Sequence, residues 1–113
     1  MKTLEQVDVI SPPDRSLLAE VRDTVRRFLP NATVLLYGSV ARGTQTPESD
    51  YDILVLTDAP LSREEEERVD RAVYDIELAH ERVVSVLYYA KDEWTKHSAM
   101  PLHVEVARDG IVV

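Results

Sequence analysis

Residues 37–56, YGSVARGTQTPESDYDILVL, place a glycine turn ahead of two closely spaced acids. Ten residues separate Gly38 and Ser39 from the pair Asp50 and Asp52. Side chains two positions apart in a strand project from the same face, so the two carboxylates are expected to point together. Neighbouring carboxylates repel one another unless a cation lies between them. Because Mg²⁺ prefers carboxylate, water and phosphate oxygens, the pair predicts a metal site.

The glycine turn has the chemistry of a phosphate site. Gly38 lets the backbone approach a ligand closely, and Ser39 offers a hydroxyl and an N–H at the start of a short helix. Arg42 could add a charged fork to the same phosphates, or it could pair with Asp50 or Glu48. The spacing therefore predicts a nucleoside triphosphate whose phosphates lie on the turn and whose cation lies on the acids.

Alternating helices and strands must position these residues. Capping signals predict a first helix that starts at 11–14 and ends at 30–31, and a long helix that starts at Ser62, where Glu65 completes a capping box. Apolar and β-branched runs predict strands. The expected strands are Thr33–Tyr37, Tyr51–Leu56 and Arg82–Tyr89, and the expected shorter helices are 39–42, Asp92–His97 and Leu102–Arg108, with a loop at 43–49. This order predicts an α/β or α+β domain over residues 1–113, with a small mixed sheet of about three or four strands packed by helices.

Composition narrows the classes of function. Thirteen Lys and Arg against 21 Asp and Glu give a formal charge of −8, which disfavours broad nucleic-acid binding. The absence of cysteine excludes thiolate metal sites and disulfides within these 113 residues. No apolar run approaches the ~18 residues of a membrane span, and the first residues lack a secretory pattern. We therefore expect a cytoplasmic protein with no membrane association.

The full motif resembles the signature of the DNA polymerase beta nucleotidyltransferase superfamily. The similarity is to the small stand-alone members called minimal nucleotidyltransferases, and it covers most of the chain. The residues that carry it are Gly38-Ser39, Ala41-Arg42-Gly43, Ser49, Asp50-x-Asp52 and the later stretch Lys91-Asp92-Glu93-Trp94.

This resemblance implies transfer of a nucleoside monophosphate, most plausibly AMP from ATP, to an acceptor with release of pyrophosphate. Asp50 and Asp52 would be the catalytic residues and would hold Mg²⁺ or Mn²⁺. The residues that would bind the nucleotide are Gly38, Ser39, Arg42 and Ser49. Many family members are antitoxins that adenylylate a HEPN toxin, so a HEPN-type partner is implied.

The sequence departs from the family pattern at one position. The superfamily usually places a third carboxylate on the neighbouring strand, where Ser85 stands here. Candidate substitutes are Glu81, Asp75 and Glu77, a water activated by the metal, or a carboxylate of a partner. The loss of a general base typically lowers a rate by about 10²–10⁴. The alternative function is therefore a catalytically weakened antitoxin or regulatory module that acts by complex formation.

Overall fold

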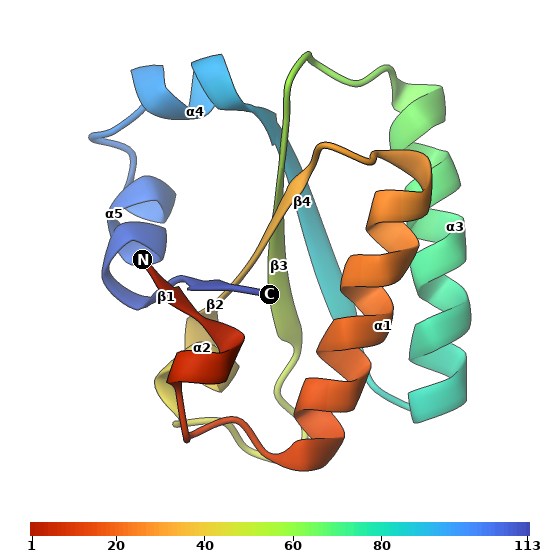
Figure 1. Ribbon diagram of the computed structural model, residues 1–113, viewed down its shortest axis with the longest axis vertical. Helices are drawn as coiled ribbons and strands as arrows, with labels where there is room; N and C mark the ends of the chain where they lie inside the picture. The colour runs from red at the N-terminus through yellow and green to blue at the C-terminus, as the bar shows by residue number, and fades with distance from the viewer.

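A five-stranded mixed sheet runs through the computed structural model, which describes residues 1–113 (Figure 1). Its spatial order is β1-β5-β2-β3-β4. The strands are β1 (Lys2–Thr3), β2 (Thr33–Tyr37), β3 (Tyr51–Thr57), β4 (Val84–Ala90) and β5 (Ile111–Val112). Strand β2 is antiparallel to both β3 and β5, whereas β4 is parallel to β3 and β1 is parallel to β5. Strand β3 thus lies between the strand that precedes the glycine turn and the strand that carries Ser85.

Helices cover both faces of the sheet. Helices α1 (Pro12–Phe28) and α3 (Arg63–His80) lie side by side on one face, as Figure 1 shows. The other face carries α4 (Lys91–Lys96) and α5 (Pro101–Asp109). The short helix α2 (Gly38–Arg42) follows β2 directly and packs against α5, and a single 3-10 turn, η1, spans Leu4–Gln6.

The two faces of β3 belong to different apolar clusters. Ile53 and Val55 pack with α1 and α3 in the larger cluster, whereas Leu54 packs with Trp94 and Val106 in the smaller one. This two-residue alternation is the strand period. Asp52 has the same parity as Leu54, so its side chain projects from the face that α4 and α5 cover only in part.

Local capping explains where the long helices begin. The Ser11 hydroxyl accepts the N–H of Asp14 at 3.3 Å, and the Ser62 hydroxyl accepts the N–H of Glu65 at 3.1 Å. The carboxylate of Glu65 in turn accepts the N–H of Ser62 at 3.0 Å, so the capping box expected at this position is confirmed. Such caps contribute about 1 kcal/mol each to the free energy of unfolding.

The structure adds two strands and shifts several element boundaries. Strands β1 and β5 contain two residues each, too few to show a hydrophobic period, so the expected count of three or four strands was low. The strand expected from Arg82 begins at Val84 instead, because Glu81 ends α3 in the left-handed conformation with φ 54°. The side chain of Arg82 then turns to donate to the carbonyl of Ser49 at 3.1 Å. None of the helices combines the length and apolar character needed to cross a bilayer.

Candidate functional site

Gly38 and Asp52 are pressed against each other where β2 ends. Tyr37 is the register partner of Asp52, so the chain leaves β2 directly beside this carboxylate. Gly38 has φ +78°, a conformation that residues with a β-carbon rarely adopt. A β-carbon built at position 38 would lie 2.2 Å from Oδ2 of Asp52. Glycine is therefore required here both for its conformation and for space, and the structure brings the turn and the acid together.

The start of β3 holds the two acids in place. Tyr51 lies between them with its side chain buried in the α1/α3 layer, where its hydroxyl donates to the buried carboxylate of Asp14. The guanidinium of Arg82 lies over the Tyr51 ring, 4.5 Å from its centre. These contacts hold the first residue of β3 in place. Asp52 then projects from the opposite face, half-buried, and Asp50 is exposed two residues earlier.

Electrostatics at Asp52 oppose its ionised form. Burial is the main cause that raises the pKa of this carboxyl, followed by the charge of Asp50 and then that of Glu105. Arg42 acts in the opposite direction and lowers the pKa of Asp52. Asp50 is therefore close enough for its charge to be felt at Asp52.

The donor set fits a hard divalent cation. A cation between Asp50 and Asp52 would relieve the repulsion that raises the pKa of Asp52. The chain does not bring together three or more His, Asp or Glu side chains as metal ligands. Mg²⁺ usually binds through one or two carboxylates and keeps its other positions for water and phosphate oxygens, so a pair is sufficient.

The two serines of the motif differ in how their hydroxyls are used. Ser39 is half-buried and its hydroxyl has no hydrogen-bond partner within the chain. The hydroxyl of Ser49 instead accepts the N–H of Thr46 at 2.9 Å and so stabilises the loop before Asp50. In the same loop Oε1 of Gln45 is buried without a partner. Ser49 thus has a structural role in the loop, and its binding to nucleotide stays a prediction.

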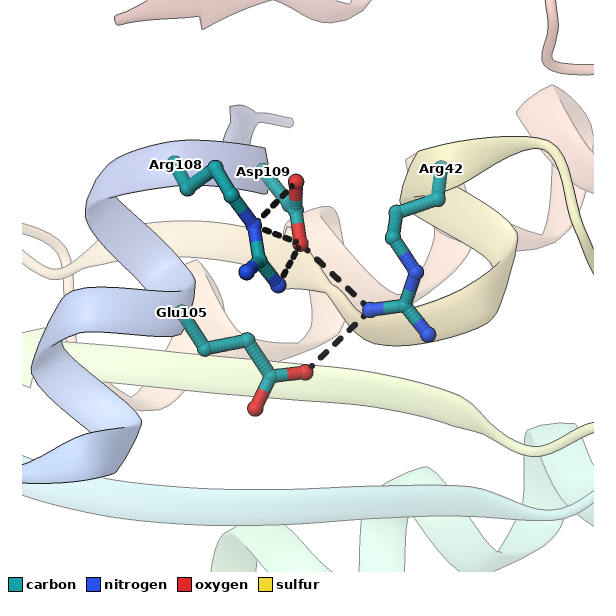
Figure 2. Close-up of polar contacts among 4 residues, drawn as sticks. All are labelled: Arg42, Glu105, Arg108 and Asp109. Carbon is teal, nitrogen blue, oxygen red and sulfur yellow. Dashed lines mark hydrogen bonds and ion pairs between the residues drawn. The ribbon is translucent and has the colours of Figure 1, made fainter.

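Arg42 is bound by two carboxylates of α5 (Figure 2). Its Nη1 donates to Oε1 of Glu105 at 3.3 Å and to Oδ2 of Asp109 at 3.4 Å. The expected alternative, a pair with Asp50 or Glu48, is wrong. Sequence reasoning could not find these partners, because they lie 63 and 67 residues further along the chain and neither belongs to a motif.

Ser85 occupies the position next to Asp52 on the neighbouring strand. The two are register partners in the parallel pair of β3 and β4. Residues that pair in register share a face of the sheet, so Ser85 stands where a third carboxylate would be expected to meet the acidic pair. The expected replacement of an acid by a hydroxyl at this point is therefore present in the structure.

The proposed substitutes for the third carboxylate lie away from Asp52. Asp75 and Glu77 belong to α3, which covers the opposite face of the sheet. Glu81 is exposed in the turn after α3, and its charge is not among the causes that shift the pKa of Asp52. Glu105 does raise the pKa of Asp52, but it also raises that of Tyr37 and is carried by a helix that packs on α2 and β2. Glu105 thus lies on the Gly38 side of Asp52, not on the Ser85 side.

The largest surface pocket lies beside this site. It has a volume of about 860 Å³ and is lined by the N-terminal segment, the end of α2 and the end of α5. Arg42 belongs to its lining, but Gly38, Asp50 and Asp52 do not. Of the acidic pair, Asp50 is exposed and Asp52 is half-buried.

A mixed sheet with a glycine turn packed against an Asp-x-Asp pair defines a protein of the nucleotidyltransferase fold. The model of the nucleotidyltransferase domain family matches residues 18–110, and the chain belongs to this family. The family expected from the motif is thereby confirmed.

Similar proteins agree with this assignment. A CCA-adding enzyme from Methanopyrus kandleri is 31% identical over 102 residues, which cover 89% of this chain and 20% of that enzyme. The chain thus spans about a fifth of this relative. A crystal structure of a toxin-antitoxin with AMP-PNP has a TM-score of 0.62 at 22% identity, covering 83% of this chain and 69% of the other. A mutant of the toxin-antitoxin MntA-HpeT gives a TM-score of 0.61 at 19% identity, with the same coverage. At these identities the structural likeness shows the fold.

Proposed function

We propose that this chain is a Mg²⁺-dependent nucleotidyltransferase that transfers AMP from ATP to an acceptor on a partner protein of the HEPN toxin type. The observation that carries the proposal is the contact between Gly38 and Asp52. It supports a turn that would bind phosphate beside a carboxylate that would bind metal. Support for a protein partner comes from the toxin-antitoxin structures that share this fold. We place the reaction in the cytoplasm, where ATP and Mg²⁺ are available.

Each residue of the motif has one task in this reaction. Asp50 and Asp52 hold the cation, which when bound neutralises phosphate charge; Mn²⁺ could replace Mg²⁺. The backbone at Gly38 and the free hydroxyl of Ser39 bind the terminal phosphates, and Arg42 contributes its guanidinium. Positioning and electrostatics supply most of the catalysis in transfers of this kind.

The transfer forms one phosphorus–oxygen bond and breaks another. An oxygen of the acceptor attacks the α-phosphorus of ATP, and the bond from that phosphorus to the oxygen bridging the β-phosphate breaks. Pyrophosphate leaves from the side of Gly38 and Ser39. Because Ser85 is a poor base at neutral pH, the proton of the acceptor hydroxyl passes to water or to a group of the partner.

The replacement at Ser85 favours a second candidate. A chain without the third acid can retain nucleotide binding while its rate of transfer falls, and it then acts as an antitoxin or regulatory module by forming a complex. This second candidate has the same fold, the same pair of metal-binding carboxylates and the same partner, and it lacks only the covalent transfer of AMP.

Incubation of the chain with radiolabelled ATP, Mg²⁺ and the product of the adjacent gene separates the two candidates. The first requires label on the partner, and this label must disappear in Asp50→Asn. A tight complex without transfer supports the second candidate. If neither label transfer nor a complex is observed, both versions are wrong.

A further inference from the structure

The guanidinium of Arg42 is anchored through one of its three nitrogens. Nη1 donates to both Glu105 and Asp109, which accounts for its two hydrogens (Figure 2). Nε and Nη2 have no acceptor within the chain. A guanidinium that is held in this way keeps its Nε–Nη2 edge free, and this edge is a bidentate donor suited to phosphate.

The anchored group belongs to the same side of the site as the glycine turn. Arg42 follows Gly38 by four residues in α2, and residues at this spacing share a helix face. The Arg42 side chain extends toward α5, where Glu105 and Asp109 accept from its Nη1 (Figure 2). Its charge is felt at Asp52, whose pKa it lowers.

Asp109 is itself fixed by a second cation. Arg108 donates to it from Nε at 3.0 Å and from Nη2 at 2.8 Å, and the Asp109 side chain is only 12% exposed. Arg108 first, and Arg42 after it, lowers the pKa of Asp109. The carboxylate is therefore stabilised in its ionised form and held by Arg108, and it can accept from Arg42 at the same time.

Glu105 has two opposing effects on a bound triphosphate. As a bare charge on the phosphate side it repels the ligand, just as it raises the pKa of Asp52 and of Tyr37. As an acceptor for Nη1 it holds Arg42 in one orientation, which reduces the freedom that the long side chain loses when phosphate binds. The two effects have opposite sign, and only the second depends on Arg42.

We propose that Glu105 and Asp109 are positioning residues that present the Nε–Nη2 edge of Arg42 to the phosphates of the nucleotide. This inference rests on the proposed function, because it requires ATP to bind at Gly38 and Arg42. It assigns a role to α5, which carries none of the motif residues.

A double-mutant cycle on ATP affinity tests the proposal. ATP is titrated calorimetrically with Mg²⁺ into the unaltered chain, Glu105→Ala, Arg42→Ala and the double variant. We expect Glu105→Ala alone to weaken binding about two- to tenfold, the loss that corresponds to freeing one long side chain. In the Arg42→Ala background the same change is expected to leave binding unchanged or to strengthen it, because only the repulsion is removed.

The matched control is Glu64→Gln, which neutralises an exposed carboxylate paired with Arg68 at 3.1 Å on α3. It should bind ATP as the unaltered chain does. A second readout is the NMR resonance of the Arg42 Nε–Hε group. This resonance should shift when ATP is added, and it should shift less in Asp109→Asn. The dispersed amide spectrum of Asp109→Asn shows whether that variant is folded.

The proposal is overturned if Glu105→Ala leaves binding unchanged or tightens it in the presence of Arg42, or if it weakens binding equally with and without Arg42. In each of these cases the unaltered chain still binds ATP, so the proposed function survives. Failure of the unaltered chain to bind ATP with Mg²⁺ overturns both.

Discussion

A β-carbon at residue 38 would stand 2.2 Å from a carboxylate oxygen of Asp52, so the turn and the acid exclude any side chain between them. We expect Gly38→Ala to displace the carboxylate and abolish measurable Mg²⁺-dependent binding of ATP. The strained backbone should also cost about 1–3 kcal/mol of unfolding free energy. Calorimetric titration and urea denaturation measure the two effects.

Gly43→Ala is a control matched in backbone conformation. Gly43 has φ +75°, but a β-carbon there would meet Val9 at 3.2 Å instead of a motif residue. This variant should lose stability and still bind ATP. Equal ATP affinity in Gly38→Ala and Gly43→Ala would contradict a direct role for the contact between Gly38 and Asp52.

Asp52 is expected to lower the stability of the metal-free fold. Its pKa is raised chiefly by burial and next by Asp50. A carboxyl whose pKa is higher in the folded than in the unfolded state destabilises the fold once it is ionised, so stability falls as pH rises through the raised pKa. Without metal, Asp52→Asn should therefore melt above the unaltered chain near neutral pH, and this difference should shrink as pH falls toward about 4.

The same substitution should remove Mg²⁺-dependent ATP binding, so that function and stability change in opposite directions. Asp58→Asn serves as the control, because Asp58 is an exposed carboxylate that pairs with Lys91 at 3.0 Å. Melting curves recorded at several pH values in the presence of a chelator measure the stability difference between Asp52→Asn and the unaltered chain. A lower melting temperature for Asp52→Asn at every pH would contradict the expectation that ionised Asp52 destabilises the fold.

Ser85→Asp restores a carboxylate beside Asp52 in the register of β3 and β4. If the chain transfers AMP, an added base at this position should raise the single-turnover rate by up to about 10²–10⁴. It should also raise the pKa of Asp52 further, since a third negative charge joins the site. Ser85→Asn has nearly the same shape without the charge, and a gain equal to that of Ser85→Asp would exclude a carboxylate effect.

Tyr51→Phe should destabilise the fold without changing ATP affinity directly. The hydroxyl donates to the buried carboxylate of Asp14, and its loss leaves that acceptor with only Arg82 at 3.8 Å. A buried group that loses its partner costs about 1–3 kcal/mol. Urea denaturation measures this change, and Tyr74→Phe on exposed α3 is the control. Equal stabilities for the two variants would show that the Asp14 bond contributes little.

Local signals sufficed for most of the fold. Neighbouring residues alone predict the strand Thr33–Tyr37, a helix start at 11–14 and the capping box at Ser62, because capping and β-propensity act over a few positions. The strands β1 and β5 are not predicted, because no local signal marks them. Two residues carry no period, and their pairing is decided by chain segments more than 100 residues apart.

The same distinction applies to the candidate site. Gly38 and Asp52 lie within a short stretch, and spacing alone predicts their observed proximity. The partners of Arg42 and of Tyr51 come from α5 and α1, and only the packed structure reveals them. Charge pairs between distant helices leave no pattern in the sequence, which is why Glu105 and Asp109 were absent from the expected site.

Strand β4 forms an outer edge of the sheet, since its one neighbour is β3. Ser85 therefore lies on the edge strand itself, and Asp52 lies one strand further in. On the proposed function, the acid that this chain lacks could be supplied along this edge by another molecule. Binding of a second protein along the β4 edge would then be required for the transfer. This chain would hold the nucleotide and the cation, and the partner would supply the group that accepts the proton. On the proposed function, such a chain would consume no ATP until its target is bound.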